Sequence, residues 1–282
     1  MLTRRDVIAG VCGIVISPLL NKPAYSQTVI EDVLPPLPND LKDAAGEPDF
    51  FSVQLEKTSL GTADPGEAKK KVAREIMANA PYNCRPIDVA SYYRNVGLGA
   101  YGMEFRVYAR GWPREYNPII IELFKATGLN PLAPEFDGDD TPWCAAFVNY
   151  CIARAVSKDG KLGPAELKRG TRSASSGSFR CFGTEVPTNT TPRIGDIAVW
   201  ALEGTVNACK PGTGHVGFFA GLTNDPEHPY FILGGNQSGD LMAGTETRRD
   251  GMILKPMPMK YLAKKTPPAY KTFQGFRTAA YL

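Results

Sequence analysis

The residues of this chain best suited to chemistry are a cysteine, a histidine and a neighbouring carboxamide. Cys144 ends the run Thr-Pro-Trp-Cys, which is typical of a helix start, because Thr141 suits the N-cap and Pro142 the first helical position. The unpaired backbone N–H groups and the dipole of a helix N-terminus favour a thiolate over a thiol. This pattern predicts that Cys144 is a nucleophile near the start of a helix that continues to about Val156. An inert buried cysteine is the alternative.

A cysteine nucleophile needs a base, and the chain has 2 histidines, of which His228 falls in a predicted turn. His215 falls in a strand-like run, 214–221, and a second strand-like run, 230–236, follows the turn. We expect the two runs to pair as a hairpin, which would place His215 on one of its strands.

The hairpin brings a carboxamide close to His215. With a turn centred near residue 226, partners across the hairpin have numbers that sum to about 452, so Gln237 lies opposite His215, with one residue of slack. That slack makes Asn236 its other near neighbour. A thiolate, an imidazole base and an amide that orients the imidazole are the parts of a cysteine-nucleophile site. We predict Cys144 as nucleophile, His215 as general base and acid, and Asn236 as the third member.

Four further residues are expected to contact the substrate. Asp140 is suited to bind a substrate amine or to add negative charge at the helix start. Gln237 adjoins the predicted carboxamide position. Gly214 precedes His215, and a glycine there is expected to leave open space for a substrate to approach. Trp143 suits either the core or the wall of the cleft.

The rest of the chain predicts the scaffold that holds these residues. Three segments before Cys144 have the apolar spacing or the end signals of helices: 65–78, 86–95 and 117–128. After the cysteine helix, 157–192 is a long connection rich in glycine, with a short helix expected at 164–168. A strand is expected at 196–201.

The first 26 residues have the features of an export signal. Arg4 and Arg5 precede an apolar run, 7–20, and a small-x-small triplet, 24–26, follows. The paired arginines resemble the twin-arginine signal, and a general secretory signal is the alternative. We therefore expect the mature protein to be periplasmic or secreted from a bacterium. The following segment, 27–64, is rich in proline and acidic residues and predicts a linker or a loosely packed arm.

Composition excludes several classes. The chain has 282 residues, of which 43% are hydrophobic and 22% charged, so it is not a disordered protein. It lacks the dense basic stripe with interleaved aromatics that nucleic-acid binding requires. The apolar run of the signal is too short for a confident membrane span, so we expect no membrane association of the mature form. The scarcity of histidine and the absence of a CxxC pair argue against zinc, and no cofactor is expected. We expect a monomer.

The cysteine count implies at least one thiol. Cys12 would leave with the signal, so the mature chain would keep an odd number of cysteines in an oxidising compartment. If Cys144 is the thiol, the other four form zero, one or two bridges. Cys181 with Cys209 is the first candidate, because both fall in loops, whereas Cys151 shares a helical face with Cys144 and suits the core.

Four motifs in order carry a resemblance to a known family: 142–149, 195–200, 214–218 and 233–238. They resemble the secreted CHAP-type amidases, which are related to the NlpC-type peptidases of the papain-like class, and 274–277 resembles that family's final strand. The resemblance implies an α+β fold, with the cysteine helix packed on a small antiparallel sheet of about five strands. It also implies cleavage of peptidoglycan peptide or amide bonds, with Cys144, His215 and Asn236 as the catalytic residues.

The expected organisation is therefore a signal (1–26), an arm (27–64), a helical extension (65–112) without a named counterpart, and a CHAP-like amidase domain (113–282). The predicted function is that of an exported cysteine amidohydrolase, which forms a thioester with a peptidoglycan peptide or another amide substrate. Two alternatives stay open. One is a non-catalytic exported binding protein on a degenerate amidase scaffold, and the other is a cysteine hydrolase that acts on a non-wall amide as an effector.

Overall fold

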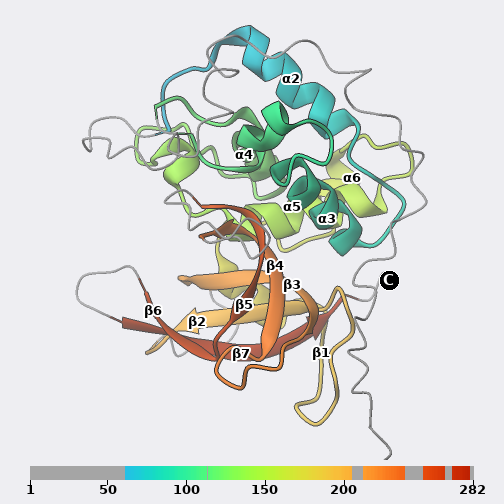
Figure 1. Cartoon of the computed structure of the whole chain (residues 1–282), viewed down its shortest axis with the longest axis vertical. Coiled ribbons are helices and arrows are strands. Elements are labelled where there is room, and N and C mark those ends of the chain that lie inside the picture. Colours follow the sequence, from blue (N-terminus) through green and yellow to red (C-terminus); the bar gives the residue numbers. More distant parts are fainter. Residues whose placement is uncertain (1–60, 113, 205–211, 239–249, 264–268, 280–282) are drawn as a thin grey trace, which may run out of the picture.

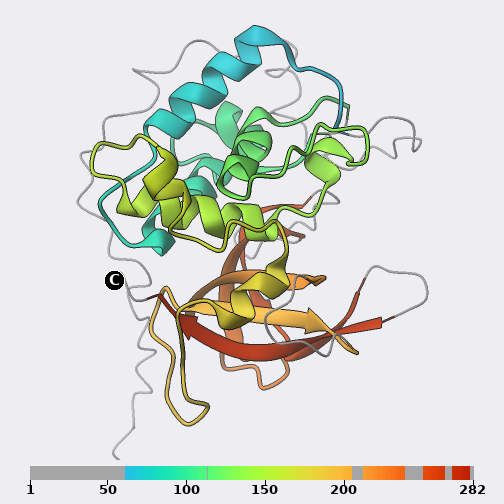
Figure 2. The same cartoon turned by 180° about the vertical axis from the view of Figure 1, so that it is seen from behind.

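The protein consists of a helical layer stacked on an antiparallel sheet. Its computed structural model describes residues 61–112, 114–204, 212–238, 250–263 and 269–279. Figures 1 and 2 show from opposite sides that the helices gather in one layer and the strands in the other. The fold is α+β, as the resemblance implied, and the sheet joins strands that are neighbours along the chain with strands that are distant.

The predicted helices are present with small shifts at their ends. The helices and the short 3-10 segments are α2 (Gly66–Ala78), α3 (Pro86–Gly97), η2 (Met103–Ala109), α4 (Pro118–Leu123), η3 (Phe124–Ala126), η4 (Gly138–Asp140), α5 (Cys144–Val156), α6 (Pro164–Leu167) and η5 (Ser176–Cys181). Asn117 caps α4 by accepting a hydrogen bond from the Ile119 N–H. Gly128, at φ +75°, ends the α4–η3 segment in the left-handed conformation that favours glycine.

The predicted helical extension shares its core with the helix that carries Cys144. Tyr93 of α3 is fully buried and packs edge-on against Phe147 and Tyr150 of α5, with ring centroids 6.3 and 6.0 Å apart. The hydroxyl groups of Tyr93 and Tyr150 are 3.2 Å apart and form a hydrogen bond. Arg154 of α5 also donates to the carbonyl oxygen of Ala78 at the end of α2. These contacts make residues 66–112 part of the structural support of α5.

Among the described residues the sheet has seven strands, not the five or so that the resemblance implied. They are β1 (Thr184–Glu185), β2 (Ile197–Leu202), β3 (Gly214–Leu222), β4 (Tyr230–Gln237), β5 (Gly251–Met257), β6 (Lys260–Ala263) and β7 (Ala269–Thr278). Their order is β1-β7-β2-β3-β4-β5, and β6 pairs with β7. The predicted hairpin is confirmed as β3–β4, and the last strand, β7, inserts beside β2.

The two faces of the sheet have different neighbours. The face toward α5, here called the helix face, includes Ile197, Val199, Val216, Phe218 and Leu233, which belong to one core with the helices. The opposite face, here called the far face, includes Ala198, Trp200, Phe219, Ile232, Met257 and Phe276, which form a separate cluster. Residues on a strand alternate between the two faces, so a side chain's face follows from its register.

Side-chain hydrogen bonds order the long connection after α5, and the buried Asn149 makes several of them. Asn149 of α5 donates from Nδ2 to the Ser173 carbonyl oxygen at 3.0 Å and accepts from the Thr171 N–H at 2.6 Å. Further along, the Ser175 hydroxyl donates to the Gly212 carbonyl oxygen at 2.7 Å. The predicted short helix in this connection is confirmed as α6.

The predicted export signal (1–26) and most of the predicted arm (27–64) lie outside the described residues. In the part of the chain that the structure does describe, no helix combines the length and the apolar character needed to cross a membrane.

Candidate functional site

Cys144 is the first residue of α5, two positions closer to the start of the helix than the sequence pattern predicted. Trp143 occupies the N-cap position without a side-chain hydrogen bond, and its carbonyl oxygen accepts from the Phe147 N–H at 2.9 Å. Thr141, the predicted N-cap, instead accepts from the backbone N–H of Asp137 at 3.1 Å. That contact holds the loop before the helix, so its hydroxyl does not cap α5.

The predicted thiolate is not the resting form of Cys144. Burial raises the pKa of the thiol, because the charged form would lose its hydration. The positive charge of Lys271 and backbone hydrogen bonds from Val216 and Ala145 lower the pKa, but they offset burial only in part. The helix start therefore aims N–H groups at the sulfur as expected, while the side chain, only 4% exposed, stays protonated near neutral pH.

His215 lies on β3 with its side chain on the far face of the sheet. It pairs across the strands with Trp200, and the two ring centroids are 6.2 Å apart. Burial, the largest cause, and the positive charges of Lys271 and Lys255 together lower the pKa of His215 to about 3. The ring is neutral at physiological pH. Its Nε2 atom is buried and has no hydrogen-bond partner among the described residues.

A β-bulge in β4 decides which carboxamide accompanies His215. Between Gly234 and Gln237 the register of β4 against β5 shifts by one residue, and Asn236 within the bulge has φ 58°. A one-residue shift moves every later side chain to the other face. Without the bulge, Asn236 would follow Ile232 and Gly234 onto the far face. With it, Gln237 takes that place.

Gln237 is the side chain that interacts with His215. The nearby amide of Gln237 raises the pKa of His215, against the larger effect of burial. Gln237 Nε2 donates to the Ile253 carbonyl oxygen at 2.7 Å, which fixes the orientation of the amide. The other end of the amide, Oε1, is buried and has no partner among the described residues, as is true of His215 Nε2. The two unpartnered atoms are a complementary acceptor and donor.

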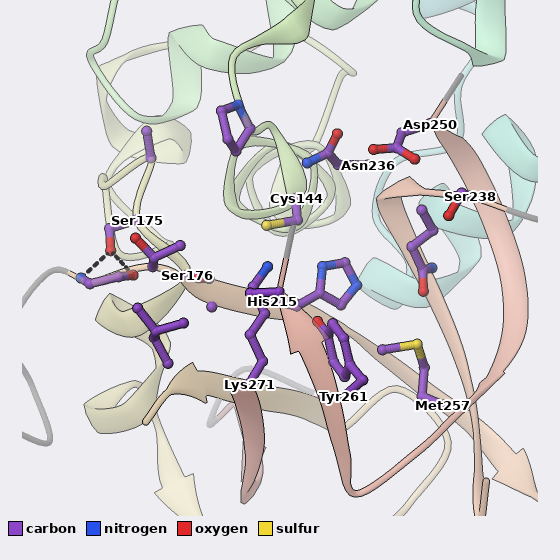
Figure 3. A pocket seen from close by; sticks show the side chains of 18 of the residues that line it. Cys144, Ser175, Ser176, His215, Asn236, Ser238, Asp250, Met257, Tyr261 and Lys271 are labelled. Carbon is purple, nitrogen blue, oxygen red and sulfur yellow. Dashed lines mark hydrogen bonds between the residues drawn. The ribbon is translucent and has the colours of Figure 1, made fainter. Parts of the chain in front are cut away.

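Asn236, the predicted third member, is not directed at His215. Figure 3 shows its carboxamide on the side of Asp250, pointing away from the His215 ring. The residue has the left-handed backbone conformation that asparagine tolerates better than most side chains. Its place in the bulge explains why strand counting alone left the choice between Asn236 and Gln237 open.

Cys144 and His215 both line a cavity of about 1140 Å³. Figure 3 shows them there together with Lys271, Tyr261 and Met257. The predicted contact residues Asp140, Gly214, Asn236 and Gln237 also line it, and Asp140 is exposed at the loop before α5. The volume slightly exceeds that of a common small-molecule pocket and suits a peptide-sized substrate.

Two of the predicted contact residues have structural reasons for their identity. Trp143 is 1% exposed, lies outside the cavity lining and packs against Phe147, where a Cβ at Gly235 would collide with its ring. The prediction that Trp143 contacts the substrate is therefore corrected, because no face of its ring is available to a ligand. Gly214 lines the cavity but leaves no open space, because a Cβ there would collide with the Trp200 carbonyl oxygen.

The cavity residues that sequence reasoning missed include Lys255 on β5, Tyr261 on β6 and Lys271 on β7. Burial and the neighbouring Cys144 raise the pKa of Tyr261, so its phenol stays protonated. Of these strands, β7 pairs with β2, which is distant in sequence, whereas β5 and β6 pair with strands that are next to them along the chain. The available signal for Lys271 was its position two residues before Phe273, which places the two side chains on the same face of a strand. That signal becomes informative only once the register of β7 is known.

The described cysteines differ in state. Cys84, Cys144 and Cys151 are reduced. Cys151 is fully buried in α5, as predicted for a core residue. Cys181 is disulfide-bonded, and Cys209, predicted to pair with it, lies outside the described residues.

Comparison with known families gives one match. The family model of the CHAP domain matches residues 136–236, a segment that begins before α5 and ends within β4. It includes Cys144 and His215 and stops one residue before Gln237. Neither the curated proteins nor the solved structures gave a significant match.

Proposed function

We propose that this chain, which carries a CHAP-type domain over residues 136–236, is a cysteine-dependent hydrolase of amide or peptide bonds. CHAP domains are typically amidases or peptidases, which supports hydrolysis as the reaction class. The observation that carries the proposal is the convergence of Cys144, His215 and Gln237 on one large cavity from a helix and two strands. A nucleophile, a base and a group that orients the base are the parts that acyl transfer requires.

Because Cys144 and His215 are both neutral at rest, the thiol proton moves to the imidazole during the attack and not before it. Cys144 is a thiol and His215 a neutral imidazole, so Sγ gives up its proton to the ring as it attacks the carbonyl carbon. The ring then protonates the leaving amine, which leaves a thioester on Cys144. Water, deprotonated by His215, hydrolyses the thioester and restores the thiol. The Cys144 backbone N–H, at the unpaired end of α5, is suited to stabilise the oxyanion.

Gln237 is the proposed orienting residue in place of Asn236. Its amide is held by Ile253, and Oε1 is left to accept a hydrogen bond from His215 Nε2. With Nε2 protonated, the other ring nitrogen is the base. This assignment uses two buried atoms that otherwise lack partners among the described residues, whereas Asn236 would have to turn from the Asp250 side.

The proposed substrate is a peptidoglycan peptide, and the proposed location is the periplasm or the exterior of a bacterium. The first proposal rests on the resemblance to CHAP-type amidases, and the second on the signal-like residues 1–26. The size of the cavity is compatible with a branched peptide.

A non-catalytic binding protein is the second candidate, because burial opposes charge on both reacting groups. Muropeptide digestion separates the two. We expect the wild-type chain to release new products from purified peptidoglycan, detected by mass spectrometry, and Cys144→Ala to release none. Cys84→Ala, which changes a half-buried cysteine outside the cavity lining, is the matched control and should retain activity. Equal digestion by wild type and Cys144→Ala would contradict the assignment.

A further inference from the structure

A tyrosine on the hairpin formed by β6 and β7 lies beside the reacting pair, and the proposed reaction gives it no role. Tyr261 pairs with Lys271 across the hairpin, and both residues line the cavity. Figure 3 shows the Tyr261 ring next to Lys271, with the hydroxyl directed toward Cys144 and His215. The Lys271 Nζ is 5.7 Å from the centre of the ring. Tyr261 therefore presents its polar end to the part of the cavity where Cys144 would meet a substrate.

The Tyr261 phenol is a neutral hydrogen-bond donor at physiological pH. Burial is the main cause that raises its pKa, and the nearby Cys144, when charged, also raises it. The hydroxyl makes no hydrogen bond to any described residue. A protonated phenol has one O–H to donate, so this proton is available to a ligand in the cavity.

Two other neutral donors of the cavity lining are already engaged. Gln237 Nε2 donates to the Ile253 carbonyl oxygen at 2.7 Å, and the Ser175 hydroxyl donates to the Gly212 carbonyl oxygen at 2.7 Å. Each would have to give up a buried or half-buried hydrogen bond in order to bind a substrate. Tyr261 would give up none among the described residues.

The proposed acyl transfer needs donors at one particular atom. When Cys144 Sγ attacks, the substrate carbonyl oxygen gains negative charge, and the backbone N–H at the start of α5 is suited to meet it. The backbone N–H groups of Ala145 and Val216 also approach the sulfur, so α5 and β3 both contact it. Tyr261 reaches the same space from a third element, β6.

We infer that Tyr261 is a catalytic residue of the proposed hydrolysis, in which its hydroxyl donates a hydrogen bond to the oxyanion together with the Cys144 backbone N–H. The inference rests on the proposed function for the reaction, and it adds the second donor of the oxyanion site. The hydrogen bond is strongest in the tetrahedral intermediate, when the oxygen is charged. It therefore lowers the barrier and leaves substrate binding nearly unchanged.

Tyr261→Phe removes this donor and keeps the ring that packs beside Lys271. The variant should cleave muropeptides with kcat lower by about 100-fold to 1,000-fold, the usual loss for one oxyanion donor, and with KM within about threefold of wild type. Tyr270→Phe is the matched control, because Tyr270 is 44% exposed, does not line the cavity and lies against Lys260. A tyrosine that only shaped the cavity wall would tolerate the loss of its hydroxyl. Equal kcat in wild type and Tyr261→Phe would therefore overturn the inference.

Two reagents test the donor without hydrolysis. N-acetylaminoacetaldehyde adds reversibly to a thiol: the sulfur bonds to the carbonyl carbon, and the thiol proton passes to the oxygen, which takes the place of the oxyanion. Iodoacetamide alkylates the sulfur with loss of iodide and a proton, and it forms no such oxygen. Protection of Cys144 from iodoacetamide by the aldehyde, followed by mass spectrometry on the full chain, gives the Kd of the adduct.

Tyr261→Phe should raise that Kd by about tenfold or more, and Tyr270→Phe should leave it unchanged. Without aldehyde, the rate of iodoacetamide alkylation at Cys144 should stay within about twofold of wild type in both variants, which shows that the site is intact. If Tyr261→Phe changes this rate as much as it changes the Kd, the hydroxyl acts on the sulfur and the inference is wrong. An aldehyde that fails to protect wild-type Cys144 would also contradict it.

The two experiments separate this inference from the proposed function. If no muropeptide is cleaved but the aldehyde Kd responds to Tyr261→Phe, the peptidoglycan assignment fails and the oxyanion donor stands. If muropeptides are cleaved and neither kcat nor the Kd responds, the hydrolase stands and the role of Tyr261 fails.

Discussion

The two faces of the sheet differ in what covers them, although the same strands form both. On the helix face, Val199, Val216 and Phe218 are at most 1% exposed and join the core that holds α5. On the far face, Trp200 is equally buried, but the surface also includes His215 and Lys271 and borders a cavity of about 1140 Å³. One face is closed by a helix, and the other leaves room for a ligand.

The difference shows how a stable fold can hold a polar site. Cys144 comes from the helix face, at the start of α5, and His215 comes from the far face of β3. They meet where β3 begins, since the Val216 N–H lies close enough to hydrogen-bond the sulfur. The site lies at the end of a strand, where residues from both faces of the sheet are within reach. Substitutions on the two faces should therefore affect different properties.

The largest effect is expected on the far face, from His215→Asn. Removal of the base should reduce kcat/KM by about 100-fold to 10,000-fold, which is the usual contribution of a general acid–base group. His228→Asn is the comparison variant: His228 also lines the cavity but lies in the β3–β4 turn, where its Nδ1 is 2.8 Å from Asp225 Oδ2, and it has no part in the proposed reaction. Rates of muropeptide cleavage would show the difference, and equal losses in both variants would contradict the role of His215.

In the core between α5 and the helix face of the sheet, Phe147→Ala should lower the free energy of unfolding but have a smaller effect on the catalytic rate. Phe147 is completely buried between Trp143 and Tyr93, and loss of a buried phenylalanine costs about 3–5 kcal/mol. Phe273→Ala on the far face, where the ring is half-buried, should cost about half as much. Urea denaturation of both variants measures the two costs. A larger loss for Phe273 would contradict the view that the helix face carries most of the stability.

Stability should also depend on pH through His215. The folded protein holds this histidine at a pKa of about 3, against an ordinary value of 6.5, mainly because the ring is buried. Between these two values the unfolded chain binds a proton that the folded chain does not, so stability is lost as the pH falls from about 6.5 toward about 3. Denaturation midpoints at several pH values should fall less steeply in this window for His215→Asn. Parallel profiles would show that His215 is not buried in its neutral form.

The smallest of these effects should separate the two carboxamides of β4. Gln237→Ala is expected to reduce kcat/KM by about 100-fold, since an imidazole that loses its orientation is misplaced by a fraction of an ångström or more. Asn236→Ala, one residue away, should change it much less, because the Asn236 side chain points away from His215. Gln237→Glu keeps an acceptor and should retain more activity than the alanine variant. The reverse ranking of the alanine variants would restore Asn236 as the orienting residue.

Local patterns predicted much of the scaffold. Helix α2 and the hairpin β3–β4 lie within a residue or two of their expected ends, because apolar periodicity and turn residues act over short distances. The start of α5 was wrong by about two residues, since Thr141 serves the preceding loop instead of the helix. The thiolate prediction failed for a different reason: burial, which sequence does not reveal at one position, outweighs the helix N-terminus.

The sequence by itself determined which residues can react: a cysteine at a helix start and a histidine on a hairpin strand, with a carboxamide nearby. These follow from spacing along one stretch of chain. Only the tertiary structure decided that a bulge brings Gln237 to His215 while Asn236 turns away, and that Lys255 and Lys271 share their cavity. Strand register and the pairing of distant segments depend on packing across the whole sheet, so no local pattern specifies them.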